Sequence, residues 1–384
     1  MQPIYLDYNA TTPVDPEVAD AMLPYLKEYF GNPSSAHWYG VQSKKAIENA
    51  RRQVAKLINA GIDEIIFTSG GSEANNLAIK GFTHTVKDKG HHIITSSIEH
   101  PAVLEVCKTL ETRGFKVTYL SVDEFGIIDL QDLERAINPN TILISIMHAN
   151  NEVGSIQPIS EISRIAHEHN IALHTDAAQS VGKIPVFVDE LGVDLLSITG
   201  HKLYAPKGVG ALYIRRGIKL QKQIHGADHE FNLRAGTENV LEIVGLGKAC
   251  EIAKRDMQKN TRHMLQCRDQ LYNGLITKIK NLKLNGHPEE KLPNTLSVSF
   301  PGLEADTILS AMEEVAASAG AACHSDHVDI SHVLKAMHVS TEAAMGAIRF
   351  SVGKFTTPNE IEKAINIIVN TVNRFYGSDK NLEH

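Results

Sequence analysis

The first 216 residues alternate between two hydrophobic periods, one typical of helices and one typical of strands. Apolar side chains recur at helical spacing over 42–60 and again over 159–169, which predicts helices there. Between such segments lie short apolar runs, several of them continuous in Val, Ile and Leu, as in strands buried on both faces. The expected strands are 64–68, 92–96, 116–122, 141–148, 171–175, 194–199 and 209–214. This order predicts an α/β fold with a mostly parallel sheet.

The last third of the chain has a different pattern of helical and extended segments, which predicts a smaller α+β domain. The expected elements are a helix over 241–280, a strand at 294–300, a helix from Ala305, a Gly/Ala-rich loop around Cys323 and a helix over 358–376. A chain of 384 residues is long for one core, so we expect two domains. We assign residues 15–257 to a large domain and residues 1–14 with 258–384 to a small one. Because no linker-like tract separates them, they should pack closely.

Composition narrows the classes of function. The formal net charge of −7 and the lack of a long basic run argue against a nucleic-acid surface. No stretch approaches the ~20 apolar residues of a membrane span. The first residues lack the basic and apolar regions of a secretory signal, so we expect a cytoplasmic protein. The four cysteines form no C-x-x-C pair, which favours free thiols over disulfides or a metal site.

Polar side chains stand where predicted strands end, which is where open α/β sheets bind ligands. Residues 69–73 read Ser-Gly-Gly-Ser-Glu between a strand and a helix, and their N–H groups with the helix dipole could cradle a phosphate. An ordinary turn capped by Ser72 fits the same residues. Lys202 follows another strand, with a hydroxyl at Thr199. A buried lysine of lowered pKa is a candidate Schiff-base amine, whereas a solvated loop lysine is the alternative and fits Lys207 better.

Two further strand ends carry an acid and an imidazole. Asp176 could pair with a cationic ring nitrogen, and Gln179 could reach a second acceptor on the same ring. A helix-capping aspartate is an equally good interpretation of Asp176. His100 could stack on a planar cofactor, although a lone histidine is more often structural. A phosphate cradle, a carboxylate, a lysine and a ring contact are together the set that pyridoxal phosphate (PLP) requires.

These residues belong to an ordered series of motifs through which the chain resembles the cysteine desulfurases of the NifS/IscS type. That family lies in the class V aminotransferase group, and selenocysteine lyase is a relative. The resemblance runs from Tyr5 to about Arg374. The matching blocks are 7–13, 31–35, 68–76, 99–100, 150–154, 174–179, 200–202, 234–237, 292–295 and the region around Cys323. It implies the PLP-dependent transferase fold type I, with a mostly parallel seven-stranded sheet in the large domain.

The resemblance also implies a role for each matching residue. The cofactor contacts would be Lys202 as the Schiff base, Asp176 at the pyridine nitrogen, Gln179 at the ring oxygen, His100 stacked on the ring, and Gly71, Ser72, Thr199 and His201 at the phosphate. Thr237 would reach the phosphate bound by the other subunit, which implies a homodimer. Arg349 and Asn151 would hold the substrate carboxylate, with Asn151 also near the ring. The catalytic residues would be Lys202, His100 and Cys323.

Cys323 stands where the family keeps its nucleophilic thiol, among small residues that suit a mobile loop. A buried cysteine that packs as a small hydrophobe is the alternative, and it fits Cys107 and Cys250 better. The loop over 321–327 reads Ala-Ala-Cys-His-Ser-Asp-His, which is closer to selenocysteine lyase than to the usual desulfurase loop. The block over 226–233 is also less rich in glycine than in the family, so its contacts with substrate or the dimer partner can differ.

Three functions are compatible with the resemblance. A cysteine desulfurase would convert L-cysteine to L-alanine and leave a persulfide on Cys323, for transfer to a scaffold or acceptor protein in iron–sulfur cluster or thiolated tRNA supply. A selenocysteine lyase would release selenide and alanine from L-selenocysteine. A non-catalytic partner protein with the PLP fold is the third, and the intact set of Lys202, Asp176, His100 and Cys323 argues against it.

Overall fold

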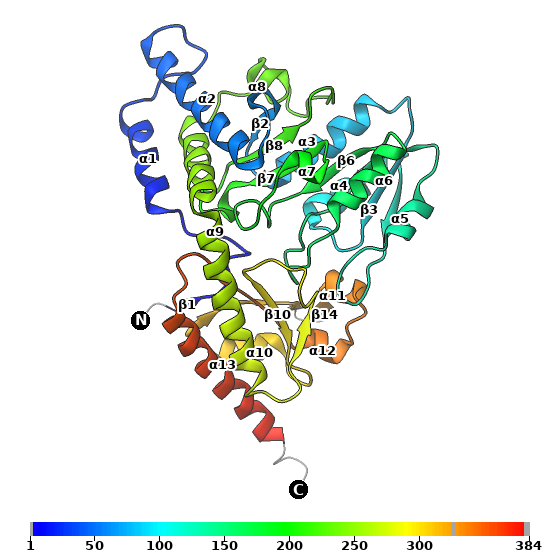
Figure 1. The fold of residues 1–384 in the computed structure, drawn as a ribbon, viewed down its shortest axis with the longest axis vertical. Helices are drawn as coiled ribbons and strands as arrows, with labels where there is room; N and C mark the ends of the chain where they lie inside the picture. Colours follow the sequence, from blue (N-terminus) through cyan, green and yellow to red (C-terminus); the bar gives the residue numbers. More distant parts are fainter. Residues whose placement is uncertain (1–2, 325–326, 380–384) are drawn as a thin grey trace.

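A seven-stranded sheet with helices on both faces forms one part of the molecule, and an antiparallel sheet with its helices forms the other (Figure 1). The structure, a computed structural model, describes residues 3–324 and 327–379, and over 321–329 and 378–379 it describes the backbone alone. Among these residues no helix is long and apolar enough to cross a bilayer. The fold class predicted from the sequence is confirmed.

The large sheet has the strand order β2-β8-β7-β6-β5-β3-β4. Only β8 runs against the others, since it pairs antiparallel with both β2 and β7 while the remaining pairs are parallel. The carboxyl ends of the six parallel strands therefore lie along one edge. The strands are β2 (Ile65–Thr68), β3 (His92–Ser96), β4 (Lys116–Leu120), β5 (Thr141–Ser145), β6 (Ala172–Asp176), β7 (Leu195–Thr199) and β8 (Gly210–Ile214).

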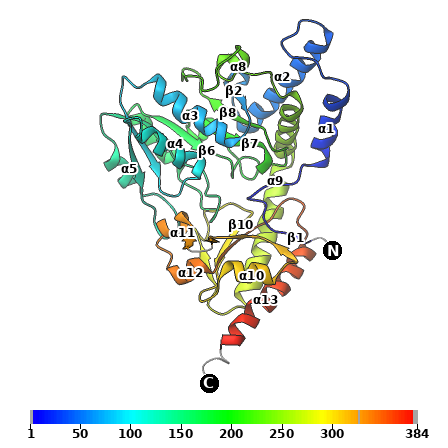
Figure 2. The same ribbon diagram turned by 180° about the vertical axis from the view of Figure 1, so that it is seen from behind.

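Helices cover both faces of this sheet. Its helices are α1 (Pro16–Lys27), α2 (Trp38–Ile58), η1 (Ile62–Glu64), α3 (Gly71–Thr85), α4 (Pro101–Glu111), α5 (Leu130–Ala136), α6 (Ile159–Glu168), α7 (Val188–Leu191), η2 (Gly200–Lys202), α8 (His229–Asn232) and α9 (Val240–Ile276). Helices α3 and α4 cover one face (Figure 2), where their apolar side chains pack on the sheet, and the apolar side chains of α2, α6 and α9 pack on the other face. Because both faces are covered, the strands are continuous apolar runs rather than alternating ones.

The second part of the molecule is built on the sheet β12-β15-β10-β9, which is antiparallel throughout. Its strands and helices are β1 (Ile4–Tyr5), β9 (Lys283–Asn285), β10 (Thr295–Ser299), α10 (Ala305–Ala311), β11 (Val315–Ala316), β12 (Ser318–Ala319), β13 (Ala321–His324), β14 (His327–Ile330), α11 (His332–Ala336), α12 (Thr341–Met345), β15 (Ala347–Ser351) and α13 (Pro358–Asp379). Its core includes Leu6 from the N-terminal segment, Leu271 of α9 and Phe350 of β15. The domain limits at residues 14 and 257 remain a prediction.

The expectation of an irregular loop around Cys323 is wrong for the backbone. Residues 318–319 pair with β15, and β13 pairs with β14 in a hairpin. Gly320 N donates to Ala347 O at 2.8 Å, and Ser331 N donates to Gly320 O at 3.1 Å. Small residues have low strand propensity, but here pairing with neighbouring strands satisfies their backbone groups and overrides that propensity.

Candidate active site

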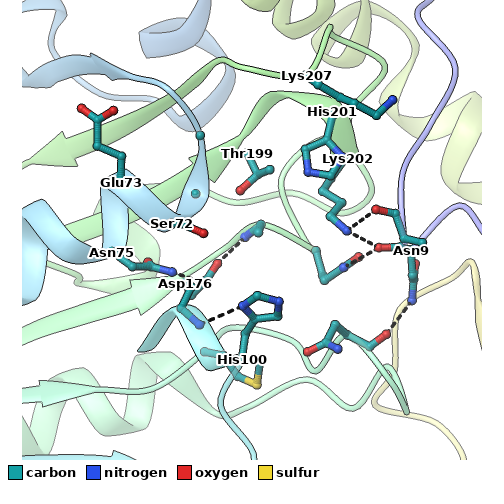
Figure 3. Close-up of a pocket in the computed structure, with 18 of the residues that line it drawn as sticks. Asn9, Ser72, Glu73, Asn75, His100, Asp176, Thr199, His201, Lys202 and Lys207 are labelled. Carbon is teal, nitrogen blue, oxygen red and sulfur yellow. Dashed lines mark hydrogen bonds between the residues drawn. The ribbon is translucent and has the colours of Figure 1, made fainter. Parts of the chain in front are cut away.

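A cavity of about 580 Å³ opens at the edge of the large sheet where β2, β6 and β7 end (Figure 3). This is the edge at which open α/β sheets bind ligands. Segments far apart in sequence meet there, including the N-terminal segment around Asn9 and β15 of the second sheet. Ten of the residues predicted from the sequence line the cavity: Gly71, Ser72, His100, Asn151, Asp176, Gln179, Thr199, His201, Lys202 and Arg349.

The start of α3 forms one wall of the cavity. Gly70 has φ 149°, a backbone conformation that favours glycine, and it turns the chain from β2 into the helix. A Cβ on Gly71 would lie 2.1 Å from Thr199 Oγ1, so only glycine allows these two segments to approach this closely. The first N–H groups of a helix have no partner within it and carry its positive dipole. The wall is therefore suited to an anion.

Asp176 presents a carboxylate whose orientation is fixed at both oxygens. The side chain lies at the end of β6 and is buried. The N–H group of Ala178 donates to Oδ1 at 2.9 Å, and Asn75 Nδ2 donates to Oδ2 at 2.7 Å (Figure 3). Each acceptor thus has a donor that sets its direction, and the carboxylate is positioned to meet a cationic group in the cavity.

Lys202 ends η2, the short helical turn that follows β7, and its side chain reaches the N-terminal segment. Nζ donates to the carbonyl oxygens of Asn9 and Ala10, the latter at 2.7 Å (Figure 3). Burial lowers the pKa of Lys202 to about 8, and the Arg349 cation contributes to the decrease. A lysine of this pKa has an appreciable unprotonated fraction near neutral pH, as a nucleophilic or basic amine requires.

His100 caps the N-terminus of α4 and lines the cavity (Figure 3). Its Nδ1 accepts from Ala102 N at 3.1 Å, so that nitrogen carries no proton. Loss of solvation lowers the pKa of His100, although the Asp176 carboxylate opposes this. A neutral ring in a fixed orientation is therefore available to stack on a flat ligand.

Two further predicted residues connect the cavity to the N-terminal segment. His201 Nδ1 lies 3.0 Å from Thr11 Oγ1, and burial, aided by Lys202, lowers the pKa of His201 to about 4. Gln179 is buried and donates from Nε2 to the carbonyl oxygen of Asn9 at 3.0 Å. The N-terminal segment therefore forms one side of the cavity.

Arg349 enters the cavity from β15 of the second sheet. One terminal nitrogen donates to the carbonyl oxygen of Asn151 at 3.0 Å, and the other donates to Asp7 Oδ1 at 2.8 Å and Ser318 Oγ at 2.9 Å. Nε is buried and has no partner within the described residues. The guanidinium is therefore held in place at the cavity, with one buried N–H group that has no partner among the described residues.

Glu99 lies beside His100 and is fully buried. Its Oε1 accepts from Ser96 Oγ at 2.6 Å and from Met147 N at 2.9 Å, and its Oε2 has no partner among the described residues. Burial raises the pKa of Glu99 to about 8. The side chain is therefore mostly a neutral acid at neutral pH and adds little negative charge beside Asp176.

Two predicted residues are not brought into the cavity by the described structure. Thr237 is exposed and does not line the cavity of its own chain. The side chain of Cys323 lies outside the described residues, so its catalytic role stays a prediction. The other three cysteines are free and buried, and burial raises the pKa of the Cys107 thiol to about 12 and also raises that of Cys250. Thiols of raised pKa are poor nucleophiles, as expected for packing residues.

Sequence reasoning did not assign individual roles to Asn75 and Asn9, which the structure places among the cavity-lining residues. Asn75 lies one helical turn after Ser72, so the helical spacing of residues 71–85 was an available signal for a shared face. Asn9 accepts from Lys202 and Gln179 at its carbonyl oxygen, and its side chain donates to Asn151 O at 3.1 Å. No local pattern around Asn9 indicates these contacts, because every partner is distant in sequence.

The chemistry of this cavity fits PLP. The start of α3 offers an anion site, and the fixed carboxylate of Asp176 and the amine of Lys202, whose pKa is lowered, line the same cavity. The buried Oδ1 of Asn75 has no partner among the described residues, which leaves a polar group beside Asp176 to be satisfied by a ligand or by water. These are the groups that bind a phosphate, a pyridine nitrogen and an aldehyde.

Comparison with known proteins agrees with this assignment. The family model described as Aminotransferase class-V matches residues 4–364. A Dictyoglomus turgidum protein named Cysteine desulfurase IscS is 52% identical over 367 residues, or 95% of this chain and 93% of that protein. A solved NifS-like protein superposes with a TM-score of 0.91 at 39% identity, covering 97% of this chain and 100% of the other. The structure titled SspA in complex with cysteine has a TM-score of 0.81 at 39% identity, covering 92% and 100%. This chain therefore belongs to the class V aminotransferase family.

Proposed function

We propose that this chain is a PLP-dependent cysteine desulfurase, which converts L-cysteine to L-alanine and leaves the sulfur as a persulfide on Cys323. The observation that carries the proposal is a single cavity lined by Lys202, Asp176 and the start of α3. The relative that is 52% identical and is named a cysteine desulfurase supports the same activity. So does the solved relative whose title includes bound cysteine.

Each cofactor contact follows from a feature of the cavity. When bound, PLP withdraws electrons from the substrate Cα and makes its C–H bond acidic. Lys202 would hold it covalently, the start of α3 with Thr199 and His201 would bind its phosphate, and His100 would stack on its ring. Asp176 would keep a proton on the ring nitrogen, because Asn75 and Ala178 hold the carboxylate in a fixed direction.

The residues of the chain then bind the substrate and move its proton. Arg349, with Asn151 beside it, would bind the substrate carboxylate, because both residues line the cavity and Arg349 is held there by Asn151 and Asp7. Lys202 would take the proton from Cα at Nζ and return it later, which its pKa of about 8 permits.

Sulfur transfer needs only a thiol and no external oxidant. The Cys323 thiolate attacks the sulfur of the bound cysteine, the bond between that sulfur and Cβ breaks, and its electrons remain with the carbon skeleton, which gains a proton. L-cysteine plus one thiol thus gives L-alanine plus one persulfide. The persulfide would pass to a scaffold or acceptor protein for iron–sulfur cluster or thiolated tRNA supply. The backbone of Cys323 lies in the β13–β14 hairpin.

A homodimer with shared sites is part of the proposal. Thr237 is exposed and away from the cavity of its own chain, where it is free to contact the cofactor of a partner. Large apolar side chains of α1, of the segment after it and of the start of α2 are exposed, among them Leu26 (66%), Phe30 (76%) and Trp38 (59%). Burying such a patch in a dimer is favourable.

The domain limits and the cellular location complete the proposal. Residues 15–257 would form the large domain and residues 1–14 with 258–384 the small one, which is supported by the hydrophobic core of the second sheet, formed by Leu6 and residues from Met264 onward. A cytoplasmic location suits the free thiols of Cys107, Cys250 and Cys267.

The test is to incubate the purified PLP-loaded protein with L-cysteine and, separately, with L-selenocysteine. We expect alanine from L-cysteine and an added sulfur on Cys323 by mass spectrometry. Cys323→Ser should abolish alanine formation from L-cysteine, while Cys250→Ser, a free cysteine in the core, serves as the matched control. Alanine from selenocysteine alone would replace the proposal with the lyase that the sequence of residues 321–327 favours, and no alanine from either would refute both activities.

A further inference from the structure

Lys183 is a buried lysine beside the cavity, with no ion pair to any described residue. It lies between β6 and α7, and 4% of its surface is exposed. Its Nζ donates to Gln179 Oε1 at 2.8 Å and to Asn9 Oδ1 at 3.3 Å. Burial, with the nearby cations of Lys202 and Arg349, lowers the pKa of Lys183 well below its ordinary value. A lysine costs more stability here than an apolar side chain of similar length.

Lys183, Gln179 and Asn9 form a closed ring of hydrogen bonds. Lys183 donates to both side-chain oxygens, and Gln179 Nε2 returns to the carbonyl oxygen of Asn9 at 3.0 Å. A carbonyl oxygen can only accept, so Gln179 must turn its nitrogen toward Asn9 and its oxygen toward Lys183. Asn9 is fixed in the same way, because its Nδ2 donates to the carbonyl oxygen of Asn151.

The ring determines which end of the Gln179 amide is beside Lys202. Lys202 Nζ and Gln179 Nε2 donate to the same acceptor, the carbonyl oxygen of Asn9. The N–H end of Gln179 is therefore on the Lys202 side, and its oxygen lies on the far side, held by Lys183. Both Gln179 and Lys202 line the cavity, whereas Lys183 lies behind it.

We propose that Lys183 is a positioning residue, which keeps an N–H group of Gln179, rather than its carbonyl oxygen, turned toward the ring oxygen of PLP. The inference rests on the proposed function, in which Gln179 binds that oxygen. Without a donor at position 183, the Gln179 oxygen loses the contact that holds it away from the cavity. Only the Asn9 carbonyl, an acceptor that Gln179 shares with Lys202, then holds the amide, and its N–H group no longer keeps a fixed direction toward the negative ring oxygen.

The test measures the pH midpoint of the visible absorption band of the bound cofactor, without substrate. An N–H donor stabilises negative charge on the ring oxygen of PLP and so favours the unprotonated form of the bound cofactor. Loss of the donor should favour the protonated form and raise the midpoint. We expect Lys183→Met, which keeps the length and removes the donor, to raise it by about one pH unit, the size expected for one hydrogen bond to a charged group.

A double-variant comparison separates positioning from general packing. Gln179→Leu removes the donor itself and should raise the midpoint by as much or more. If Lys183 acts through Gln179, Lys183→Met should cause no further shift in the Gln179→Leu background. Lys291→Met is the matched control, because burial also lowers the pKa of Lys291 to about 8 but the residue lies away from the cavity. Its midpoint should equal that of the wild-type protein.

The outcomes distinguish this inference from the proposed function. A wild-type protein that shows no cofactor band would refute the proposed function. If the wild-type band is normal, an unchanged midpoint in Lys183→Met would overturn the role of Lys183 but not the proposed function. Additive shifts in the double variant would do the same. Should Lys183→Met fail to fold, Lys183→Leu also removes the donor with a shorter side chain, and the shift it causes must likewise vanish in the Gln179→Leu background.

Discussion

Asn75 Nδ2 donates to Asp176 Oδ2 at 2.7 Å and thereby joins helix α3 to the end of strand β6. Both side chains are buried. Helix α3 also begins with the glycines of the anion site, so one helix sets both the anion site and the direction of the carboxylate. The distance between these two groups is thus determined by the helix rather than by flexible loops.

Asn75→Ala should weaken PLP binding and catalysis without unfolding the protein. The variant removes a hydrogen bond to a charged group, which contributes about 1.5–3 kcal/mol and corresponds to a loss of roughly 10- to 100-fold. Equilibrium dialysis of PLP in the Lys202→Ala background measures the affinity, and alanine release in the parent background measures kcat/KM. Asn76→Ala, whose partner is the Ser72 carbonyl, is the matched control. Equal PLP affinity in Asn75→Ala and the control would contradict the role of this contact.

Gly71→Ala should destabilise the protein and damage the anion site, because the added Cβ would lie 2.1 Å from Thr199 Oγ1. Overpacking of this kind costs about 1–3 kcal/mol, which thermal unfolding followed by circular dichroism can detect. Thr199→Ala in the same chain removes the clashing oxygen and should restore part of the lost stability. Gly377→Ala, with nothing within 4 Å of its added Cβ, should change little. A Gly71→Ala protein as stable as the wild type would refute the close contact.

Attachment of PLP to the cofactor-free protein should depend on pH with a midpoint near 8. Only unprotonated Nζ attacks an aldehyde, and the pKa of Lys202 is about 8. The attachment rate should rise about tenfold per pH unit below 8 and level off above it, whereas an ordinary lysine would continue to gain up to about pH 10.4. Absorbance after mixing gives the rate, with Lys202→Ala as the blank. A rate that still climbs between pH 9 and 10 would contradict the lowered pKa.

Glu99 should make the protein less stable as the pH rises from about 4.5 to 8. Its pKa is about 8 in the folded protein and near 4.5 when unfolded, so the folded state binds more protons in this window and loses stability as they dissociate. Glu99→Gln is neutral throughout and should lose less stability over the same window. Urea unfolding of the cofactor-free proteins at pH 5, 7 and 8.5 compares them, with Glu168→Gln at the surface as control. Equal losses of stability with rising pH in the wild type and in Glu99→Gln would contradict the conclusion that Glu99 is a buried neutral acid.

The sequence predicts the large sheet well because its signals are local. Continuous apolar runs bounded by polar residues place β3 and β7 within a residue of their observed limits. The turns that carry Gly71, Asp176 and Lys202 follow directly from these strands, so their meeting at one edge follows from parallel pairing. The ten predicted residues that line the cavity are of this kind or come from the resemblance.

The parts that were not predicted depend on contacts between distant segments. Asn9 and Lys183 are brought together by three-dimensional packing, and neither stands at the end of a predicted strand. The strands at 318–324 carry little local signal, since Ala and Gly are poor strand formers. They form because β14 and β15 supply partners for their backbone groups.

The length of helix α9 has a consequence for how the protein unfolds. At 37 residues and 1.5 Å per residue it spans about 55 Å, and it passes between the two parts of the molecule (Figure 1). Leu246 and Cys250 belong to the core beneath the large sheet, whereas Leu271 and Leu275 belong to that of the second sheet. Unfolding of either core would remove the packing contacts of half of helix α9. The two halves of the molecule should therefore lose their structure in one cooperative transition rather than in two.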